Sequence, residues 1–461
     1  MAKAKKMVFA AKDEFDTPYT VANAFRKGDT MTRLSALVMG LGDIVHHQYI
    51  KGVLFLLTEV AYIWYMVREG WSQIAGLPGL GSVEQGEVYN EALGIYEYTA
   101  GDNSLLILLF GIVALFVTFG FILIWRANMK SCYKAQVLQQ EGKPLPTFKQ
   151  DIANLFDGNL QTTLLTLPCL GIVVFTILPL VFMICMAFTN YSVVGQHLVL
   201  FDWVGLVNFG EVLNFGSVLG QQFWSVLGWT IVWAIFATFL NYIMGMILAL
   251  IINRKETKGK AFWRFCFILS IAVPQFVSLM VIRTMLQPNG IVNVMLQNAG
   301  WITTPLPWFT NATWARVTVI VINLWVGIPY TLMNLTGILQ NIPAELYESA
   351  KVDGANAFTT FWKITLPYMI FVTTPNLITT FTGNINNFNV IYLLSNGDPT
   401  PVGHTAGKTD LLVTWLYKLT IDRQQYNIGA VIGILTFVVL SIVSLVTYRS
   451  SGSYKNEEGF M

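Results

Sequence analysis

Eight long apolar runs dominate this 461-residue chain and restrict it to folds that can lie within a lipid bilayer. A helix needs about 20 apolar residues to cross the hydrocarbon core, where all its backbone hydrogen bonds are satisfied within the segment. Hydrophobic residues make up 54% of the chain and charged residues 12%, whereas typical soluble domains contain about 25% charged residues. The sequence therefore predicts an all-α polytopic membrane protein with spans at 50–68, 104–126, 164–188, 224–252, 262–286, 317–339, 368–394 and 426–448.

Basic residues between the apolar runs predict how the chain is threaded through the membrane, because cytoplasmic loops carry an excess of Lys and Arg. The segments 189–223 and 288–314 contain neither residue and are expected outside, although Lys408, Lys418 and Arg423 in the last external loop depart from the rule. The even number of spans then places both termini in the cytoplasm. The basic residues behind this assignment follow the second and fourth runs: Arg126, Lys130, Lys134, Lys143, Lys149, Arg254, Lys255, Lys258, Lys260 and Arg264.

The runs also divide the chain into regions. Residues 1–34 are expected to form a cytoplasmic segment without a cleaved signal peptide, because acidic residues follow the basic N-terminus. Residues 35–160 contain two accessory spans and a cytoplasmic linker, 161–449 contain six further spans, and 450–461 form a cytoplasmic tail. The stretch 35–45 is too short to span and predicts a re-entrant or interfacial helix. An acidic loop between the first two spans is expected outside and contains Glu84, Glu87, Glu91 and Glu97.

A polar, helix-forming segment from Ala344 to Pro367 separates the sixth and seventh runs. Pro343 suits a helix start, and Glu345 and Glu348 lie in the first turns, where the helix N-terminus favours negative charge. Gly354 favours a turn and, with other small residues, allows a partner to approach the backbone closely. The pattern predicts a helix, a turn and a second helix lying along the membrane. An ordinary amphipathic interfacial helix is the alternative interpretation.

Polar side chains recur on one face of each of the two runs that flank this segment. In the seventh run they are Asn376, Thr380, Asn384 and Asn387, with Gly383 beside them, and in the sixth they are Asn323, Gly327, Tyr330 and Asn334, where Pro329 is expected to loosen the helix. An unpaired buried amide costs about 1–3 kcal/mol, so these groups need partners, water or a ligand. Adhesion between helices is the simpler interpretation, but interhelical hydrogen bonds in membranes average only about 0.6 kcal/mol. Amides and a phenol suit a neutral sugar, and the stripes predict a substrate path.

Other classes of membrane protein fit less well. A proton-coupled carrier places Asp, Glu or His in its core spans, and the third to eighth runs contain none of these residues. Glu59 and Arg283 are the clear intramembrane charges and are assigned structural or interfacial roles. The four histidines and four cysteines form no spacing typical of a metal site or catalytic triad, so no enzyme, metal or cofactor is predicted. An ATP-independent secondary carrier or channel remains the alternative from another class.

The spacing of the polar segment resembles the EAA signature of binding-protein-dependent ABC importer permeases. In that family the segment docks on a separate ATP-hydrolysing subunit, and this chain contains no Gly-x-x-x-x-Gly-Lys-Ser/Thr sequence with which to bind ATP itself. The resemblance implies a six-helix permease core at 161–449, with its coupling loop at 343–367, plus two N-terminal helices. The implied ATPase-coupling residues are Glu345, Glu348, Ser349, Ala350, Asp353, Gly354, Ala355, Ile364, Leu366 and Pro367.

Three longer motifs, at 325–330, 384–388 and 393–399, resemble the MalF-type permease subunit of maltose and maltodextrin importers. In that family the two helices line the sugar site. Thr380 stands where the family has a serine, and Gly383 replaces an aromatic residue. Carried over position by position, the implied substrate-binding residues are Val326, Gly327, Tyr330, Thr380, Gly383, Asn384 and Asn387.

The resemblance also implies the partners and location of the chain. They are a second, MalG-like permease, a MalK- or MsmK-like ATPase dimer that binds ATP and Mg, and an extracellular solute-binding protein. The short loop after the third run matches the Gram-positive type, in which the binding protein is a lipoprotein. The chain is expected in a bacterial cell membrane, as a multi-pass protein that imports an oligosaccharide and binds no nucleic acid. Maltodextrin leads among the sugars, and raffinose-type and multiple-sugar permeases are the alternatives.

Overall fold

The structure is a computed structural model that describes residues 19–90, 94–254 and 256–450. The expected terminal segments up to residue 18 and beyond 450, together with Glu91 and Lys255, lie outside the described residues. The chain forms two compact units: unit 1 runs to Cys185 and includes Gln196–Trp203, and unit 2 comprises Met186–Gly195 and the residues from Val204 onward. This division falls near the end of the third apolar run, and the domain boundaries expected from sequence stay a prediction.

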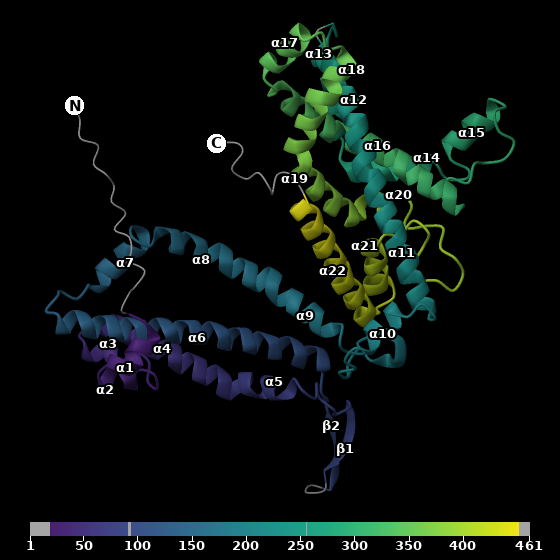
Figure 1. Ribbon diagram of the computed structural model, residues 1–461. Helices are drawn as coiled ribbons and strands as arrows, with labels where there is room; N and C mark the ends of the chain where they lie inside the picture. Colours follow the sequence, from purple (N-terminus) through teal and green to yellow (C-terminus); the bar gives the residue numbers. More distant parts are fainter. Residues whose placement is uncertain (1–18, 91–93, 255, 451–461) are drawn as a thin grey trace, which may run out of the picture. The chain divides into compact units, whose positions relative to one another are not determined.

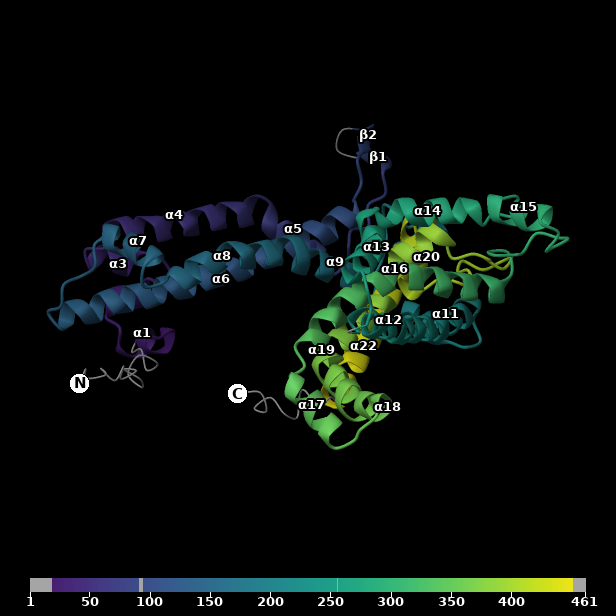
Figure 2. The same cartoon turned by 90° about the horizontal axis from the view of Figure 1, so that it is seen from above.

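Unit 1 is built around α6, a helix of 37 residues that is about 55 Å long at 1.5 Å per residue and exceeds the thickness of the hydrocarbon core. The short helices α1 to α3 lie near one end of α6, and a two-stranded hairpin lies near the other (Figure 1, Figure 2). The elements of unit 1 are α1 (Val21–Lys27), α2 (Thr30–Leu34), α3 (Leu41–Val45), α4 (Tyr49–Tyr65), η1 (Met66–Gly70), α5 (Trp71–Gly76), β1 (Gly86–Asn90), β2 (Ile95–Thr99), α6 (Ser104–Gln140), α7 (Phe148–Phe156), α8 (Leu160–Ile172), η2 (Val173–Ile177) and α9 (Leu178–Met186).

The stretch 35–45 contains no helix long enough to span a membrane, since its one helix, α3, has five residues. Gly40 stands between α2 and α3 with a φ of 80°, and a side chain there would meet the backbone oxygen of Gly52 at 1.9 Å. The carboxylate of Asp43 is buried and accepts a hydrogen bond from Ser131 of α6 at 2.9 Å. Burial raises the pKa of Asp43 above its ordinary value. A hydrogen bond to a buried carboxylate therefore connects α3 to α6.

Unit 2 contains the remaining helices. Figure 1 shows α17 and α18 at one end of the unit and α10 at the opposite end. The elements are η3 (Val194–Gln196), α10 (Val207–Leu213), α11 (Val218–Ile235), η4 (Phe236–Leu240), α12 (Asn241–Asn253), α13 (Lys260–Ala272), α14 (Gln275–Met285), α15 (Ile291–Asn298), α16 (Ala312–Gln340), α17 (Ala344–Val352), α18 (Ala357–Thr360), η5 (Phe361–Thr365), α19 (Leu366–Ile385), α20 (Phe388–Leu394), α21 (Leu412–Tyr417), η6 (Lys418–Asp422) and α22 (Tyr426–Ser450).

The described residues contain six helices that are long and apolar enough to span a membrane, or up to seven if one bent pair counts as a span. The all-α polytopic class is confirmed, but the count of eight spans is not. The fifth run bends by 85° between α13 and α14, because Pro274 restricts the residue before it to extended backbone. The seventh run divides into α19 and α20, where the Asn387 side chain caps the N-terminus of α20. The six long helices are Tyr49–Gly76, Ser104–Gln140, Leu160–Met186, Val218–Asn253, Ala312–Gln340 and Tyr426–Arg449.

The core of unit 2 consists of two apolar clusters. One centres on Trp233, Leu279 and Val319, and the other on Met246 and Leu332. Helices α12 and α16 approach each other closely in the second cluster. A side chain added at Gly245 would meet Thr331 of α16 at 2.7 Å, so only glycine allows this packing distance.

Candidate functional site

A polar cavity of about 310 Å³ lies inside unit 2. Three groups of helices form its walls: η4 with α12, α16, and α19, while α14 contributes one residue. Its lining residues are Ala237, Thr238, Asn241, Tyr242, Gln275, Asn323, Val326, Gly327, Tyr330, Thr331, Asn334, Leu335, Asn376, Leu377, Thr380, Asn384 and Asn387.

The structure brings the two predicted polar stripes together in this cavity. Six of the seven predicted substrate-binding residues line it, and so do the further stripe residues Asn323, Asn334 and Asn376. Gly383 does not line the cavity, and a side chain added there would meet no atom within 4 Å. The six are Val326, Gly327, Tyr330, Thr380, Asn384 and Asn387. Their role in substrate binding stays a prediction.

On the α16 wall, the helix runs without interruption through Pro329, so this proline does not break it. Asn323 is 4% exposed, whereas Tyr330 is 59% exposed and also lines the cavity. One continuous helix therefore offers both a fixed amide and an accessible aromatic group.

On the α19 wall, Asn384 is held in position by three neighbours. Its side-chain nitrogen donates to Thr238 Oγ1 at 3.0 Å, and its side-chain oxygen accepts from Asn387 Nδ2 at 3.4 Å. The indole of Trp233 donates to the backbone oxygen of Asn384 at 3.1 Å. These bonds link α19 to α11 and η4, so the amide is already oriented before any ligand arrives.

Sequence reasoning missed the third wall, which η4 and α12 provide. Asn241 is buried; its side-chain nitrogen donates to Ala237 O at 2.7 Å, and its side-chain oxygen has no hydrogen-bond partner among the described residues. A side chain added at Gly327 would meet this amide at 2.4 Å. Asn241 is the only amide residue between 223 and 252, a signal that could have been used. Gln275 enters the wall because it follows the bend at Pro274.

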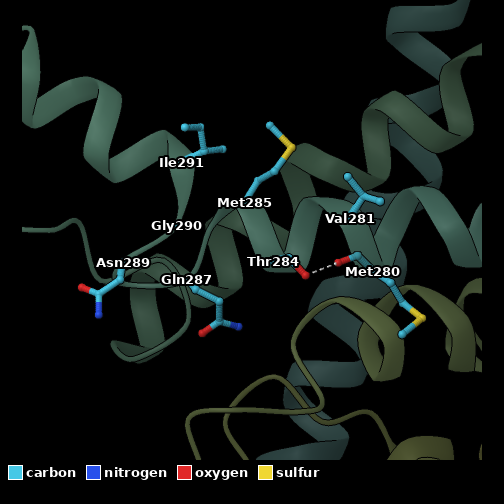
Figure 3. Close-up of a pocket in the computed structure, with 8 residues that line it drawn as sticks. All are labelled: Met280, Val281, Thr284, Met285, Gln287, Asn289, Gly290 and Ile291. Carbon is cyan, nitrogen blue, oxygen red and sulfur yellow. Dashed lines mark hydrogen bonds between the residues drawn. The ribbon is translucent and has the colours of Figure 1, made fainter.

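A larger cavity of about 590 Å³ lies outside these walls, on α14 and the loop that follows it (Figure 3). Met280, Met285 and Ile291 line this cavity together with a few polar groups. The Thr284 hydroxyl donates a hydrogen bond to Met280 O of its own helix at 3.0 Å. None of the predicted site residues lies there. Its lining offers no convergent set of polar groups comparable to that of the α16 and α19 cavity.

The predicted coupling loop forms the expected helix, turn and helix. Gly354 follows α17 with a φ of 72°, and its N–H donates to Lys351 O at 3.0 Å, while Ala355 N–H reaches Ala350 O at 2.9 Å. This pattern closes a helix with a left-handed residue, a conformation that favours glycine. The Asn356 side chain then caps α18 by accepting from Thr359 N–H at 2.8 Å.

The ten predicted coupling residues do not share one environment. Ala350 is buried, and Ala355, Ile364 and Leu366 are half-buried, so these four support the loop from inside. Three apolar residues that the prediction did not include, Val352, Phe358 and Trp362, are 88%, 72% and 53% exposed. The exposed members of the predicted set are Glu345, Glu348, Ser349, Asp353, Gly354 and Pro367.

The coupling loop connects directly to both predicted walls. Only residues 341–343 separate α16 from α17, and Ile342 among them is buried in the second apolar cluster. On the other side, α18, η5 and α19 follow one another without a gap, and Pro367 is the second residue of α19. Tyr347 also bonds Thr365 at 3.1 Å through their hydroxyls. Helix α17 is therefore joined to α19 by the chain itself and by hydrogen-bonded and packed groups.

An ordered loop between α20 and α21 lies on the same helices. Trp229 of α11 donates to Thr409 O at 3.1 Å, and Arg316 of α16 donates to Lys408 O at 2.9 Å. The loop carboxylate of Asp410 is buried and pairs with Lys418 at the start of η6, whose Nζ lies 2.8 Å from Asp410 Oδ2. Burial raises the pKa of Asp410 although Lys418 opposes this. The loop is thus fixed to α16, which forms one wall of the cavity, and to α11, which leads directly into η4.

Comparisons with known proteins show which proteins this chain is similar to. Residues 241–451 match the family described as "Binding-protein-dependent transport system inner membrane component". The chain is 34% identical to "Galactooligosaccharides transport system permease protein GanP" of Bacillus subtilis, over 92% of this chain and 98% of the relative. It is 35% identical to "Maltodextrin transport system permease protein MdxF" of the same organism, over 92% and 96%.

Two further matches cover less of the chain. Identity to "Maltose/maltodextrin transport system permease protein MalF" of Escherichia coli is 37%, over 54% of this chain and 49% of the relative. A chain of the solved "bacterial alginate ABC transporter in complex with alginate pentasaccharide-bound periplasmic protein" aligns with a TM-score of 0.54 and 23% identity, covering 66% of this chain and 98% of that one. The last match shows the fold.

Proposed function

We propose a function from the premise that the chain belongs to the family of binding-protein-dependent transport system inner membrane components: it forms half of the path by which an ATP-driven importer moves an oligosaccharide. The observation that carries the proposal is the polar cavity between α12, α16 and α19, two of whose walls continue directly into the coupling loop. Force applied at α17 thus reaches the groups that would hold the substrate.

The lining chemistry favours a neutral, hydroxyl-rich substrate. None of the described residues that line the cavity is charged, and amides both donate hydrogen bonds to hydroxyl groups and accept them. The exposed ring of Tyr330 adds a flat apolar face. Seven amide side chains converge on the cavity: Asn241, Gln275, Asn323, Asn334, Asn376, Asn384 and Asn387.

Maltodextrin is the first substrate to test, because the helix pair resembles that of MalF-type subunits. The two B. subtilis relatives are named for different sugars at 34% and 35% identity, so a galactooligosaccharide is the second candidate. Overall identity does not separate the two. The substrate-facing groups on α16 and α19 are the positions at which the choice would be made.

The other half of the path is supplied by a second homologous permease, and the motor by an ATPase dimer that docks on the exposed side of α17 and α18. A solute-binding protein delivers the sugar at the outer face. Basic residues such as Arg126, Lys130 and Lys134 at the C-terminal end of α6 support a cytoplasmic position for that end. Both termini then lie in the cytoplasm.

Reconstitution in proteoliposomes tests this proposal. The chain is combined with its candidate second permease, ATPase and solute-binding protein, and uptake of labelled maltotriose is measured with and without ATP, with galactobiose as competitor. The proposal expects uptake that requires all four components and stops without ATP. Uptake by this chain alone, independent of ATP, would overturn it.

A further inference from the structure

The hairpin between α5 and α6 has a base fixed to the rest of unit 1. The Asp102 carboxylate accepts hydrogen bonds from the N–H groups of Val83 and Ser82 at 2.9 and 2.8 Å. These two donors hold the pKa of Asp102 below its ordinary value. The residues that flank the hairpin bond the loop after the third apolar run. Trp203 Nε1 donates to Leu77 O at 2.8 Å, and Ser104 N–H donates to Val199 O at 2.9 Å. The hairpin therefore lies on the same side of the membrane as the loop after the third apolar run.

One face of the hairpin gathers tyrosine side chains. In the antiparallel register Tyr89 pairs with Tyr96 and Glu87 pairs with Tyr98, so these four side chains point to the same side. The rings of Tyr89 and Tyr96 lie 5.1 Å apart at an angle of 58°. Tyr89, Tyr96 and Tyr98 are 52%, 69% and 67% exposed. We call Glu87, Tyr89, Tyr96 and Tyr98 the tyrosine face.

This face has no cover within the described part of unit 1, where the two strands pair with each other and no helix packs broadly against them. A two-stranded hairpin alone is only marginally stable in water and is normally stabilised by packing against a further element. Exposed tyrosines are the residues that most often anchor protein interfaces, because they bury a large area at a small cost in side-chain entropy. The tyrosine face is therefore suited to binding the surface of another protein.

The charge of this segment narrows the kind of partner. Residues 77–103 contain four glutamates and Asp102 but no Lys or Arg. A bilayer surface rich in anionic lipid would repel such a segment. A neutral sugar would gain nothing from the net charge, and the tilted rings of Tyr89 and Tyr96 offer no single stacking plane. The negative charge of residues 77–103 would attract a basic patch on a protein and orient it for docking.

We propose that the tyrosine face docks a basic surface of the extracellular solute-binding protein. This inference rests on the proposed function, because it needs the hairpin to be extracellular and the transporter to use a binding protein. The inference assigns part of the contact with the solute-binding protein to the accessory region 35–160, outside the expected six-span core.

Binding of the solute-binding protein to the complete transporter in nanodiscs tests the inference. Tyr96→Ser removes an aromatic anchor from the tyrosine face, and Glu87→Lys reverses a charge on it. Glu97→Lys makes the same charge reversal on the opposite face of the hairpin. The inference expects the dissociation constant to rise about tenfold or more for Tyr96→Ser and Glu87→Lys, and distinctly less for Glu97→Lys. Raising the salt concentration should weaken wild-type binding.

The outcomes separate this inference from the proposed function. Suppose that the wild-type transporter takes up sugar in proteoliposomes when the binding protein is present, but all three variants bind the binding protein as tightly as wild type does in nanodiscs. The inference is then wrong and the proposed function stands. If wild type shows no response to the binding protein, the proposed function itself fails. Equal weakening by Glu87→Lys and Glu97→Lys would show long-range attraction without docking. If wild type binds protein-free anionic vesicles and the Tyr96→Ser variant does not, the tyrosine face belongs to lipid instead. If the variant loses binding to maltotriose alone, the face belongs to sugar.

Discussion

Replacing Gly327 by alanine should separate the packing of α12 against α16 from the general effect of alanine in a helix. The new methyl group would lie 2.4 Å from the Asn241 side-chain nitrogen and 2.7 Å from its oxygen. Overpacking of this kind costs about 1–3 kcal/mol, and replacing glycine by alanine inside a helix returns about 1 kcal/mol. The net loss for Gly327→Ala is therefore roughly 0–2 kcal/mol.

Gly337→Ala is the matched control on the same helix, since a methyl group there meets no atom within 4 Å. This variant should keep the gain of about 1 kcal/mol, so the two alanine variants should differ by about 1–3 kcal/mol. The assay is the midpoint of thermal unfolding of the purified complex, combined with the KM for sugar uptake. Gly327→Ala should lower the midpoint and raise the KM, because the displaced amide moves within the sugar cavity.

Asn241→Ala completes the test as a double-mutant cycle. Removing the amide eliminates the atoms that the methyl group would meet, so Gly327→Ala should cost much less in this background, with a coupling within the range of about 0.5–3 kcal/mol typical of residues in contact. Equal behaviour of Gly327→Ala and Gly337→Ala, or an unchanged cost of Gly327→Ala in the Asn241→Ala background, would refute the reasoning.

Three further perturbations probe other parts of the molecule. Gly354→Asp should leave the protein in the membrane but release the ATPase, because the new side chain would enter the open space beside Gly354, where we propose that the ATPase docks; normal co-purification of the ATPase would count against docking there. Asn384→Leu leaves Thr238 Oγ1 without its donor at 3.0 Å and should abolish sugar-dependent ATP hydrolysis while assembly persists; unchanged sugar selectivity in both Asn384→Leu and Tyr330→Ala would remove the site from this face. Asp410→Asn should destabilise unit 2 by at most about 3–5 kcal/mol, because Lys418, whose side chain is 12% exposed, loses its counter-ion, and adding Lys418→Met should restore much of the unfolding midpoint; no recovery in the double variant would show that the ion pair is not the cause.

Helical periodicity explains why the sequence could predict two walls of the cavity. Residues spaced by three and four lie on one helix face whatever surrounds the helix, so Asn323 and Tyr330, or Thr380 and Asn384, could be grouped without a structure. Which faces meet is a different matter. The contact between α12 and α16 depends on the fit of the Asn241 amide beside Gly327, which no pattern within one helix encodes.

The number of spans was harder to predict, because hydropathy does not report helix continuity. The fifth run is apolar throughout its bend, yet Pro274 turns α14 away from α13 by 85°. The seventh run ends as a helix at Ile385, and Asn387 starts α20 as its cap. By contrast, the turn at Gly354 was predictable, since its left-handed backbone favours glycine.

Accessibility of a single cysteine in the cavity tests the central claim that the sugar passes between α16 and α19. The four native cysteines are replaced by alanine, and Thr380→Cys is compared with Thr379→Cys, whose neighbouring position does not line the cavity. In the assembled transporter, reaction of Thr380→Cys with a membrane-impermeant thiol reagent should be slowed by the transported sugar and altered by a non-hydrolysable ATP analogue. Thr379→Cys should respond to neither. Reaction of Thr380→Cys at one rate in all conditions would contradict the account.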